Sequence, residues 1–157
     1  LSMMTKEIRN HEKNCKKHNL KPVIRLNTTS DIMWENHKIM ELFPGVIFYD
    51  YTKHFKRMLK YLRGELPKNY HLTFSRNEAN DKETMEVLRH GGNVSIVFRG
   101  KLPEIYNGYK VINGDLHDLR FTDPKNVIVG LKEKPFLNPE TNKKEIDQSG
   151  FVIDLNK

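Results

Sequence analysis

Polar and charged side chains follow the short apolar segments of this sequence. The segments at residues 23–26, 46–49, 70–74 and 94–98 have the length and composition of buried strands. Parallel strands of α/β proteins bring their carboxyl ends to one edge of a sheet, where ligands bind. The side chains expected at that edge are those of Arg25, Asn27, Asp31, Asp50, Lys53, His71, Ser75, Arg76 and Arg99.

Most of these residues are candidates for binding an anion. Arginine and lysine supply positive charge, and helices that begin at the same edge would add backbone N–H donors. Asparagine, serine and aspartate also occur in βα loops as turn formers and helix caps, which explains part of the pattern without a ligand. The candidate ligand-binding residues are Arg25, Asn27, Asp31, Lys53, Ser75, Arg76 and Arg99.

Asp50 and His71 are the candidate catalytic residues. A carboxylate or an imidazole at a ligand-binding edge can act as a general acid or base. His71 and Thr73 form one His-x-Thr pattern, but phosphodiesterases of that type use two, and the sequence has no second His-x-Ser/Thr. The alternative for His71 is a buried structural histidine in a strand, so the catalytic residues stay open.

The sequence predicts no metal site and no bound cofactor. One cysteine, Cys15, excludes a cysteine-cluster zinc or iron–sulfur site formed by this chain alone. Asp115 and Asp118 are three residues apart and would share a face if their turn were helical. With His117 they could bind a divalent metal, but an acidic turn after an Asn-Gly pair is common and is the explanation we favour. Glycine-rich phosphate loops and the common hydrolase and zincin motifs are absent.

Positive charge is concentrated in two segments. Of the net charge of +7, residues 1–25 carry +5 and residues 53–76 carry +6, and the remainder is acidic overall. Localised positive charge attracts nucleic-acid phosphates, and solvated helix faces are the alternative explanation. On a predicted helix over residues 53–63, the basic residues, Arg57 included, lie away from an apolar stripe. The candidates for nucleic-acid contact there are Lys56, Lys60 and Arg63.

The alternation of strands and amphipathic helices predicts an α/β fold of repeated βα units with a mainly parallel sheet. A chain of 157 residues is shorter than the roughly 250 residues of an eight-unit barrel. The sheet should therefore be open or form a partial (half) TIM-barrel-like layer. Helices are expected over residues 5–19, 32–43, 53–63 and 80–90, with glycine stops at Gly64 and Gly91. The residues expected in the core are Trp34, Phe43, Phe48, Leu59, Phe74 and Val97.

The length fits a single α/β domain over residues 1–157. Residues 1–20 predict an N-terminal polar helix, and residues 133–157 a polar C-terminal extension in which residues 151–153 form a last strand or a docking arm. No apolar run approaches the roughly 18 residues of a membrane span, and no signal peptide is recognisable. We expect a cytoplasmic protein without a membrane partner and leave its oligomeric state open.

Five motifs resemble an uncharacterised family of hypothetical proteins from bacteriophages, prophages and plasmids. The resemblance extends over about residues 6–154, with the motifs in the order found in the family. The motifs lie at residues 21–32, 48–53, 69–76, 118–124 and 129–132. This resemblance implies a bacterial host cytoplasm, but no established activity.

Longer members of that family have a cysteine-rich segment upstream of the first helix, which suggests a metal or iron–sulfur centre in them. Residues 1–157 contain no such segment. We expect an accessory protein that binds nucleic acid or another phosphate-bearing ligand. One alternative is an enzyme, or a truncated remnant of a metal-dependent or iron–sulfur-dependent enzyme, with its site at the strand ends. Another alternative is an inhibitor that binds a host protein.

Overall fold

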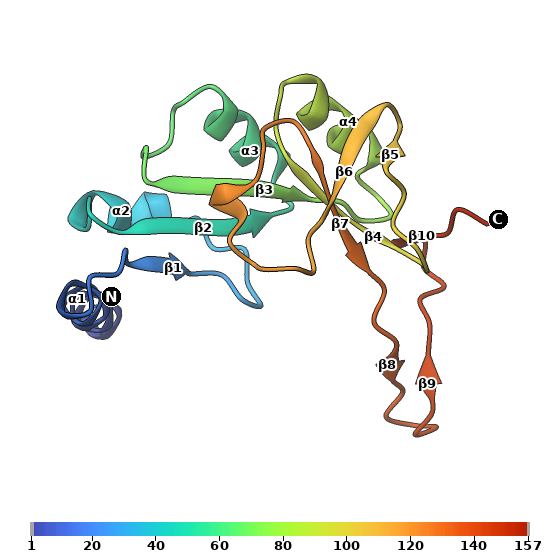
Figure 1. The fold of residues 1–157 in the computed structure, drawn as a ribbon, viewed down its shortest axis with the longest axis horizontal. Coiled ribbons are helices and arrows are strands. Elements are labelled where there is room, and N and C mark those ends of the chain that lie inside the picture. Colours follow the sequence, from blue (N-terminus) through green and yellow to red (C-terminus); the bar gives the residue numbers. More distant parts are fainter. Residues whose placement is uncertain (1, 157) are drawn as a thin grey trace.

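The four apolar segments form parallel strands in one sheet, as predicted from the sequence. The computed structural model describes residues 2–156, in which neighbouring strands pair in the order β1-β2-β3-β4. Figure 1 shows helices between these strands. The strands span Val23–Arg25 (β1), Ile47–Thr52 (β2), Tyr70–Ser75 (β3) and Val94–Phe98 (β4).

Later segments of the chain extend the sheet beyond β4. The next strand, β7, is parallel to β4, β6 is parallel to β7, and β5 is antiparallel to β6. The short strand β10 pairs with the end of β4, beyond the point at which β3 stops. The sheet is therefore mostly parallel, whereas its half-barrel curvature stays a prediction. These strands span Ile105–Tyr106 (β5), Tyr109–Asn113 (β6), Ile128–Lys132 (β7) and Val152–Ile153 (β10).

Helices follow the central strands and lie on one side of them. In Figure 1, α3 (Phe55–Leu62) and α4 (Asp81–Arg89) are on the same side of the sheet. Both end where the sequence predicts, because Gly64 and Gly91 have positive φ and donate their N–H groups back to the last turn. The first helix, α1 (Ser2–Lys17), lies at the end of the sheet where β1 and β2 begin.

The single helix predicted over residues 32–43 is wrong. Lys38 has a φ of 56°, in the left-handed region, and interrupts the helical backbone. It separates the 3₁₀ turn η1 (Trp34–His37) from the short helix α2 (Ile39–Leu42). The side chain of Asn27 also binds the start of this segment, which holds it outside helical geometry. Apolar spacing alone could not reveal either constraint.

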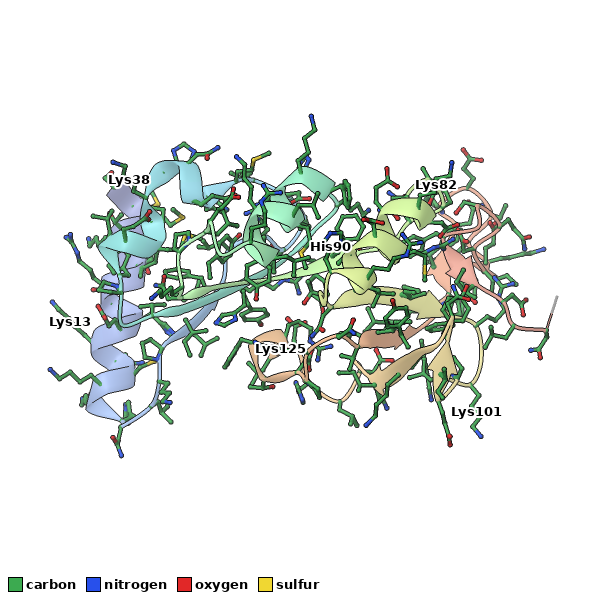
Figure 2. All side chains as sticks on the ribbon, turned by 90° about the horizontal axis from the view of Figure 1, so that it is seen from above. Lys13, Lys38, Lys82, His90, Lys101 and Lys125 are labelled. Atoms are coloured by element: carbon green, nitrogen blue, oxygen red, sulfur yellow. The ribbon has the colours of Figure 1, made fainter. Side chains whose placement is uncertain are left out.

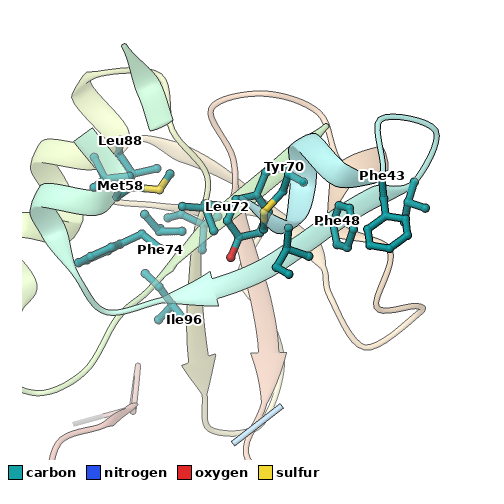
Figure 3. Packing of buried hydrophobic residues seen from close by; sticks show 14 of the residues in the cluster. Phe43, Phe48, Met58, Tyr70, Leu72, Phe74, Leu88 and Ile96 are labelled. Atoms are coloured by element: carbon teal, nitrogen blue, oxygen red, sulfur yellow. The ribbon is translucent and has the colours of Figure 1, made fainter. Parts of the chain in front are cut away.

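The apolar core lies between the sheet and its helices. Figure 3 shows Phe48 and Phe74 from the strands in the same cluster as Met58 and Leu88 from the helices, all four fully buried. Phe43 is also buried, as predicted. Three residues expected in the core are only partly buried, namely Trp34, Leu59 and Val97.

Two arginines connect the C-terminal extension to the sheet. The first, Arg76, follows β3, and its Nη1 donates to the carbonyl oxygens of Gly150 and Phe151, both at 2.7 Å. Its Nε donates to Asp81 at the start of α4, also at 2.7 Å. Arg76 thus joins the β3–α4 loop to the residues just before β10.

The second arginine holds the base of a projecting hairpin. Arg99 follows β4 and forms ion pairs with Glu133 at 2.8 Å and Asp154 at 3.0 Å, which flank the extension. Between them, β8 (Phe136–Leu137) and β9 (Lys144–Glu145) form a two-stranded antiparallel hairpin. Figure 1 shows this hairpin extending away from the main sheet. The polar extension therefore combines a last strand in the sheet with a separate projecting arm.

A buried arginine of α3 connects the first three strands. The sequence predicts Arg57 on an exposed helix face, but only 3% of its surface is exposed, which corrects that prediction. Its Nε and Nη2 donate to the Glu35 carboxylate at 2.8 and 2.7 Å, and its Nη1 donates to Asp31 at 2.8 Å. Its Nη2 also donates to the hydroxyl of Tyr70, which in turn donates to Asp50 at 2.6 Å. This arginine network fixes the loop after β1 against β2, β3 and α3.

Replacing Arg57 with Gln should lower the free energy of unfolding by about 3–5 kcal/mol, because it leaves two buried or partly buried carboxylates without their cation. Urea denaturation measures the change. The matched control is Lys56→Gln, one residue earlier and exposed, which should change stability by no more than about 0.5 kcal/mol. Equal effects of the two substitutions would contradict a stabilising role for the network.

Candidate functional site

A cavity lies at the carboxyl ends of β1, β2 and β3. Its volume is about 340 Å³, within the range of small-molecule sites. Five of the residues predicted for this edge line it, namely Arg25, Asn27, Asp31, Lys53 and Ser75. The other lining residues are Thr28, Thr29, Ser30, Tyr51 and Thr52. We call this cavity the edge cavity.

Asp31 forms one wall of the edge cavity and is fully engaged within the protein. Its Oδ1 accepts from Arg57, and its Oδ2 accepts from Thr52 Oγ1 at 3.0 Å and from the Lys53 N–H at 2.7 Å. No helix begins beside Asp31, so the helix-cap explanation offered by the sequence does not apply. Its carboxylate orders the loops on both sides of the cavity instead.

Asp50 lies beneath the edge cavity. It is fully buried and accepts from the backbone N–H of Asn27 at 2.7 Å, from the Asn27 side chain at 3.1 Å and from Tyr70. Burial raises the pKa of Asp50, and the hydrogen bonds from Tyr70 and Asn27 oppose that rise. The position of Asp50 supports the cavity floor, and no ligand in the cavity would meet its carboxylate directly.

Arg25 lies at the boundary of the edge cavity, on the face of the sheet opposite to Asp50. Its guanidinium lies over the Tyr51 ring, 4.8 Å from the centroid, and donates to Asp118 at 3.0 Å. The hydroxyls of Tyr49 and Tyr51 also donate to Asp118, at 3.1 and 3.4 Å. Burial, to which the Asp118 charge adds, raises the pKa of both tyrosines to about 12. Both phenols therefore remain protonated donors at neutral pH.

The sequence offers Asp118 only together with its neighbours, as a metal-binding turn, and gives no sign of its pairing with Arg25. The two residues are 93 positions apart, so no local pattern could have linked them. The turn that carries Asp118 also helps to line a second cavity of about 520 Å³. The two cavities share Arg25, Tyr51 and Ser75 and therefore adjoin.

The free polar side chains of the edge cavity are one ammonium and three hydroxyls, all of which can donate hydrogen bonds. Within residues 2–156, the Lys53 ammonium and the hydroxyls of Thr28, Thr29 and Ser75 have no hydrogen-bond partner. By contrast, both oxygens of Asp31 accept hydrogen bonds from protein donors. Acceptor atoms would complement the Lys53 ammonium and could also accept from the three hydroxyls.

Three predicted site residues lie away from the edge cavity. Arg76 lines the adjoining cavity but is engaged by the C-terminal extension. Arg99 lies in a separate depression, where its guanidinium binds two carboxylates and the carbonyl oxygen of Asp147. His71 lines a third cavity of about 580 Å³, and its ring centroid is 6.0 Å from that of Phe121. The predicted convergence of all nine residues at one edge is therefore wrong in part.

The third cavity lies beside the first part of β3, which has no partner in β4. These strands pair only through the last two residues of β3, and the 3₁₀ turn η2 (Arg120–Thr122) lies near the unpaired part. The η2 turn buries Arg120 beside Asp123, with Nε 3.3 Å from the carboxylate. His71 is half-buried there, and burial lowers its pKa. His71 therefore lies in the third cavity, whereas Asp50 lies beneath the edge cavity, so the two candidate catalytic residues do not share a site.

The exposed basic residues of α3 differ in whether a carboxylate pairs with their charge. Arg63 pairs with Glu65, which reduces its attraction for a ligand. Lys56 and Lys60 are exposed, and neither has an ion-pair partner in the described part of the chain. Lys53 precedes the helix by two residues and lines the edge cavity. The free lysines of this region therefore continue from the cavity onto α3.

Two other kinds of site are absent from residues 2–156. No group of three or more His, Cys, Asp or Glu side chains there could hold a metal ion. Asp115, a residue of the acidic turn after the Asn-Gly pair, instead accepts from the Lys132 N–H at 2.8 Å. In the same residues, every helix is too short or too polar to cross a bilayer.

Comparison with known proteins identifies one family. Residues 1–155 match the family model described as Gene product 88. This match confirms the resemblance to an uncharacterised phage-type family that the sequence motifs indicated. No curated protein and no solved structure matches the chain.

Stability should depend on pH through His71. Because burial lowers its pKa in the folded state, the unfolded chain binds a proton that the folded chain does not as pH falls through about 6.5. The free energy of unfolding should therefore decrease from pH 7.5 to pH 5, and His71→Phe should reduce that decrease. Urea denaturation at both pH values measures it. An unchanged pH dependence in the variant would contradict this prediction.

Proposed function

We propose that this chain, which belongs to the Gene product 88 family, binds a phosphate-bearing ligand in the edge cavity and that the ligand is a nucleic-acid strand. The family assignment supports a phage-type protein. The proposed setting is the cytoplasm of a bacterial host, where such a protein would meet nucleic acid. A cavity of about 340 Å³ holds a nucleotide-sized group but not a duplex.

The observation that carries this proposal is the free Lys53 ammonium in the edge cavity, together with three free hydroxyls that can donate. The ammonium of Lys53 and three hydroxyls have no partner in the described residues, whereas the Asp31 carboxylate is already satisfied. Phosphate oxygens are acceptors that suit ammonium and hydroxyl donors. The guanidinium of Arg25 also lines the cavity, but its charge is paired with Asp118.

The exposed lysines of α3 indicate that the ligand is a nucleic-acid strand rather than an isolated phosphate. Lys56 and Lys60 are one and two helical turns beyond Lys53, which lines the cavity. A nucleic-acid strand with one phosphate in the edge cavity could therefore place its next phosphates against α3. Such contacts are independent of base sequence and weaken with salt.

The enzyme alternative has less support from the geometry. Asp50 is fully buried beneath the edge cavity, and His71 lines a different cavity. Neither is placed to transfer a proton to a ligand held by Lys53. A remnant of a metal-dependent enzyme would need a cysteine-rich segment outside these residues, and the edge cavity offers no further argument for it.

A protein-binding function is favoured by one specific feature, the β8–β9 hairpin. Phe136 and Leu137 on this hairpin are 51% and 59% exposed, and the hairpin projects from the sheet (Figure 1). Exposed apolar side chains on a projecting arm are typical of a contact with another protein. The hairpin is separate from the edge cavity, so Phe136→Ser with Leu137→Ser should leave nucleic-acid binding unchanged.

Replacing Thr28 and Thr29 with Val should weaken binding of a 12-nucleotide oligothymidylate without changing the salt dependence, because the variant removes donors but no charge. Lys53→Gln should weaken binding and also lower the salt slope by about 0.7. Fluorescence anisotropy at several salt concentrations measures both quantities. The control is Lys82→Gln, an exposed lysine of α4 outside the lining of the edge cavity. Wild-type affinity in both cavity variants would exclude the edge cavity as the binding site.

Replacing Lys56, Lys60 and Arg63 together with Gln should weaken oligonucleotide binding equally across base sequences. Each phosphate left without its cation should lower the salt slope by about 0.7 for a single strand. Most of the effect should come from the two lysines, because Arg63 is paired with Glu65. Restoring Arg63 alone should therefore recover little affinity. An unaltered slope in the triple variant would show that α3 presents only a solvated face.

A further inference from the structure

The basic residues of α1 form a second surface, at the opposite end of the strands from the edge cavity. Successive residues of an α-helix are rotated by about 100°, which places all five basic residues of α1 within a sector of about 100°. All five are exposed. We call this sector the α1 basic face; its residues are Lys6, Arg9, Lys13, Lys16 and Lys17.

The opposite side of α1 packs against the protein. Ile8 and Cys15 are buried there, and Met4 packs against the core cluster. Figure 2 shows α1 crossing the end of the molecule, with the Lys13 side chain pointing away from the sheet. The helix is therefore held in place by its apolar side, which leaves the α1 basic face in solvent.

The charges of the α1 basic face are not neutralised by the protein. None of its residues forms an ion pair with any described residue. The two acidic residues of the helix, Glu7 and Glu12, lie outside the sector, and Glu12 points toward the position of Gly45 on the protein body. Five positive charges thus face solvent without an intervening carboxylate.

Helix stability explains only part of this arrangement. Cations in the last turn interact favourably with the helix dipole, which accounts for Lys16 and Lys17. The same dipole gives no benefit to Lys6 and Arg9 in the first half, and the first turn holds no acidic residue. An anionic partner would explain why positive charge continues along the whole helix.

The geometry favours duplex nucleic acid over a membrane as that partner. An interfacial membrane helix buries its apolar side in lipid, but the apolar side of α1 is already buried in the protein. Lys6 and Lys17 are about 16 Å apart along the helix axis. Duplex DNA carries one negative charge per about 1.7 Å of its axis, so each residue of the face can meet a phosphate over that length.

We propose that the α1 basic face binds the phosphate backbone of double-stranded nucleic acid without sequence preference. This binding surface is distinct from the edge cavity and does not depend on the function proposed for it. The chain would then hold a single strand at the edge cavity and a duplex at the other end of its sheet.

The test measures binding of a 20-base-pair DNA duplex by fluorescence anisotropy between 50 and 200 mM salt. Replacing all five residues of the α1 basic face with Gln should reduce affinity at least about tenfold at low salt and lower the salt slope by about 0.9 for each phosphate that no longer meets a cation. Arg9→Gln with Lys13→Gln should lower the slope by about 1.8. The thermal unfolding midpoint of the Arg9→Gln, Lys13→Gln variant should not change, because both side chains are exposed and lie outside the last turn of α1. In the five-residue variant it should fall slightly, because the helix dipole loses Lys16 and Lys17.

The matched control removes the same net charge from exposed lysines elsewhere. It should retain most of the affinity and the wild-type slope. The residues replaced with Gln are Lys82, Lys101, Lys110, Lys143 and Lys144. The five-residue α1 variant should still bind oligothymidylate, which separates this inference from the edge cavity. Equal reductions in affinity in the α1 variant and the control, an unchanged slope in the α1 variant, or binding of anionic phospholipid vesicles but not of duplex would each overturn the proposal.

Discussion

The burial of the Arg57 guanidinium is the constraint on which the candidate site depends. A buried cation is costly unless several acceptors surround it, and Arg57 has acceptors from η1, from the loop after β1 and from β3. Through Tyr70 the same network reaches Asp50 in β2, and Asp50 holds Asn27. The loop that lines the edge cavity is therefore fixed from below by hydrogen bonds, although its own sequence is polar and irregular.

This network also determines the chemical character of the edge cavity. Arg57 and the Lys53 N–H donate hydrogen bonds to the Asp31 carboxylate. Asp31, the acidic residue of the cavity, therefore has little capacity to accept hydrogen bonds from a ligand. What remains open is the Lys53 ammonium and a set of hydroxyls. A cavity lined by an aspartate can thus favour an anion, since hydrogen bonds within the protein have already satisfied that aspartate.

The basic residues of this chain separate into those that hold the structure and those that face solvent. Arg57, Arg76 and Arg99 each join segments distant in the sequence, and their guanidinium groups are occupied. Arginine suits such positions because its planar group can bind several acceptors at once. Lysines supply most of the free charge, on α3 and on the α1 basic face. Because carboxylates or carbonyl groups bind the structural arginines, the positive charge that faces solvent comes mainly from lysines.

The sequence by itself determined β1 to β4, their parallel direction and the helix ends at Gly64 and Gly91, because hydrophobic periodicity and glycine conformation act over a few neighbouring residues. It also placed five residues at one edge of the sheet, since parallel strands share the position of their carboxyl ends. Only the tertiary structure decided which charges are free. Arg25 meets Asp118, 93 residues away, and Arg76 and Arg99 meet the C-terminal extension. Such pairs form only when distant segments fold together, so local patterns cannot distinguish a ligand-binding arginine from a structural one.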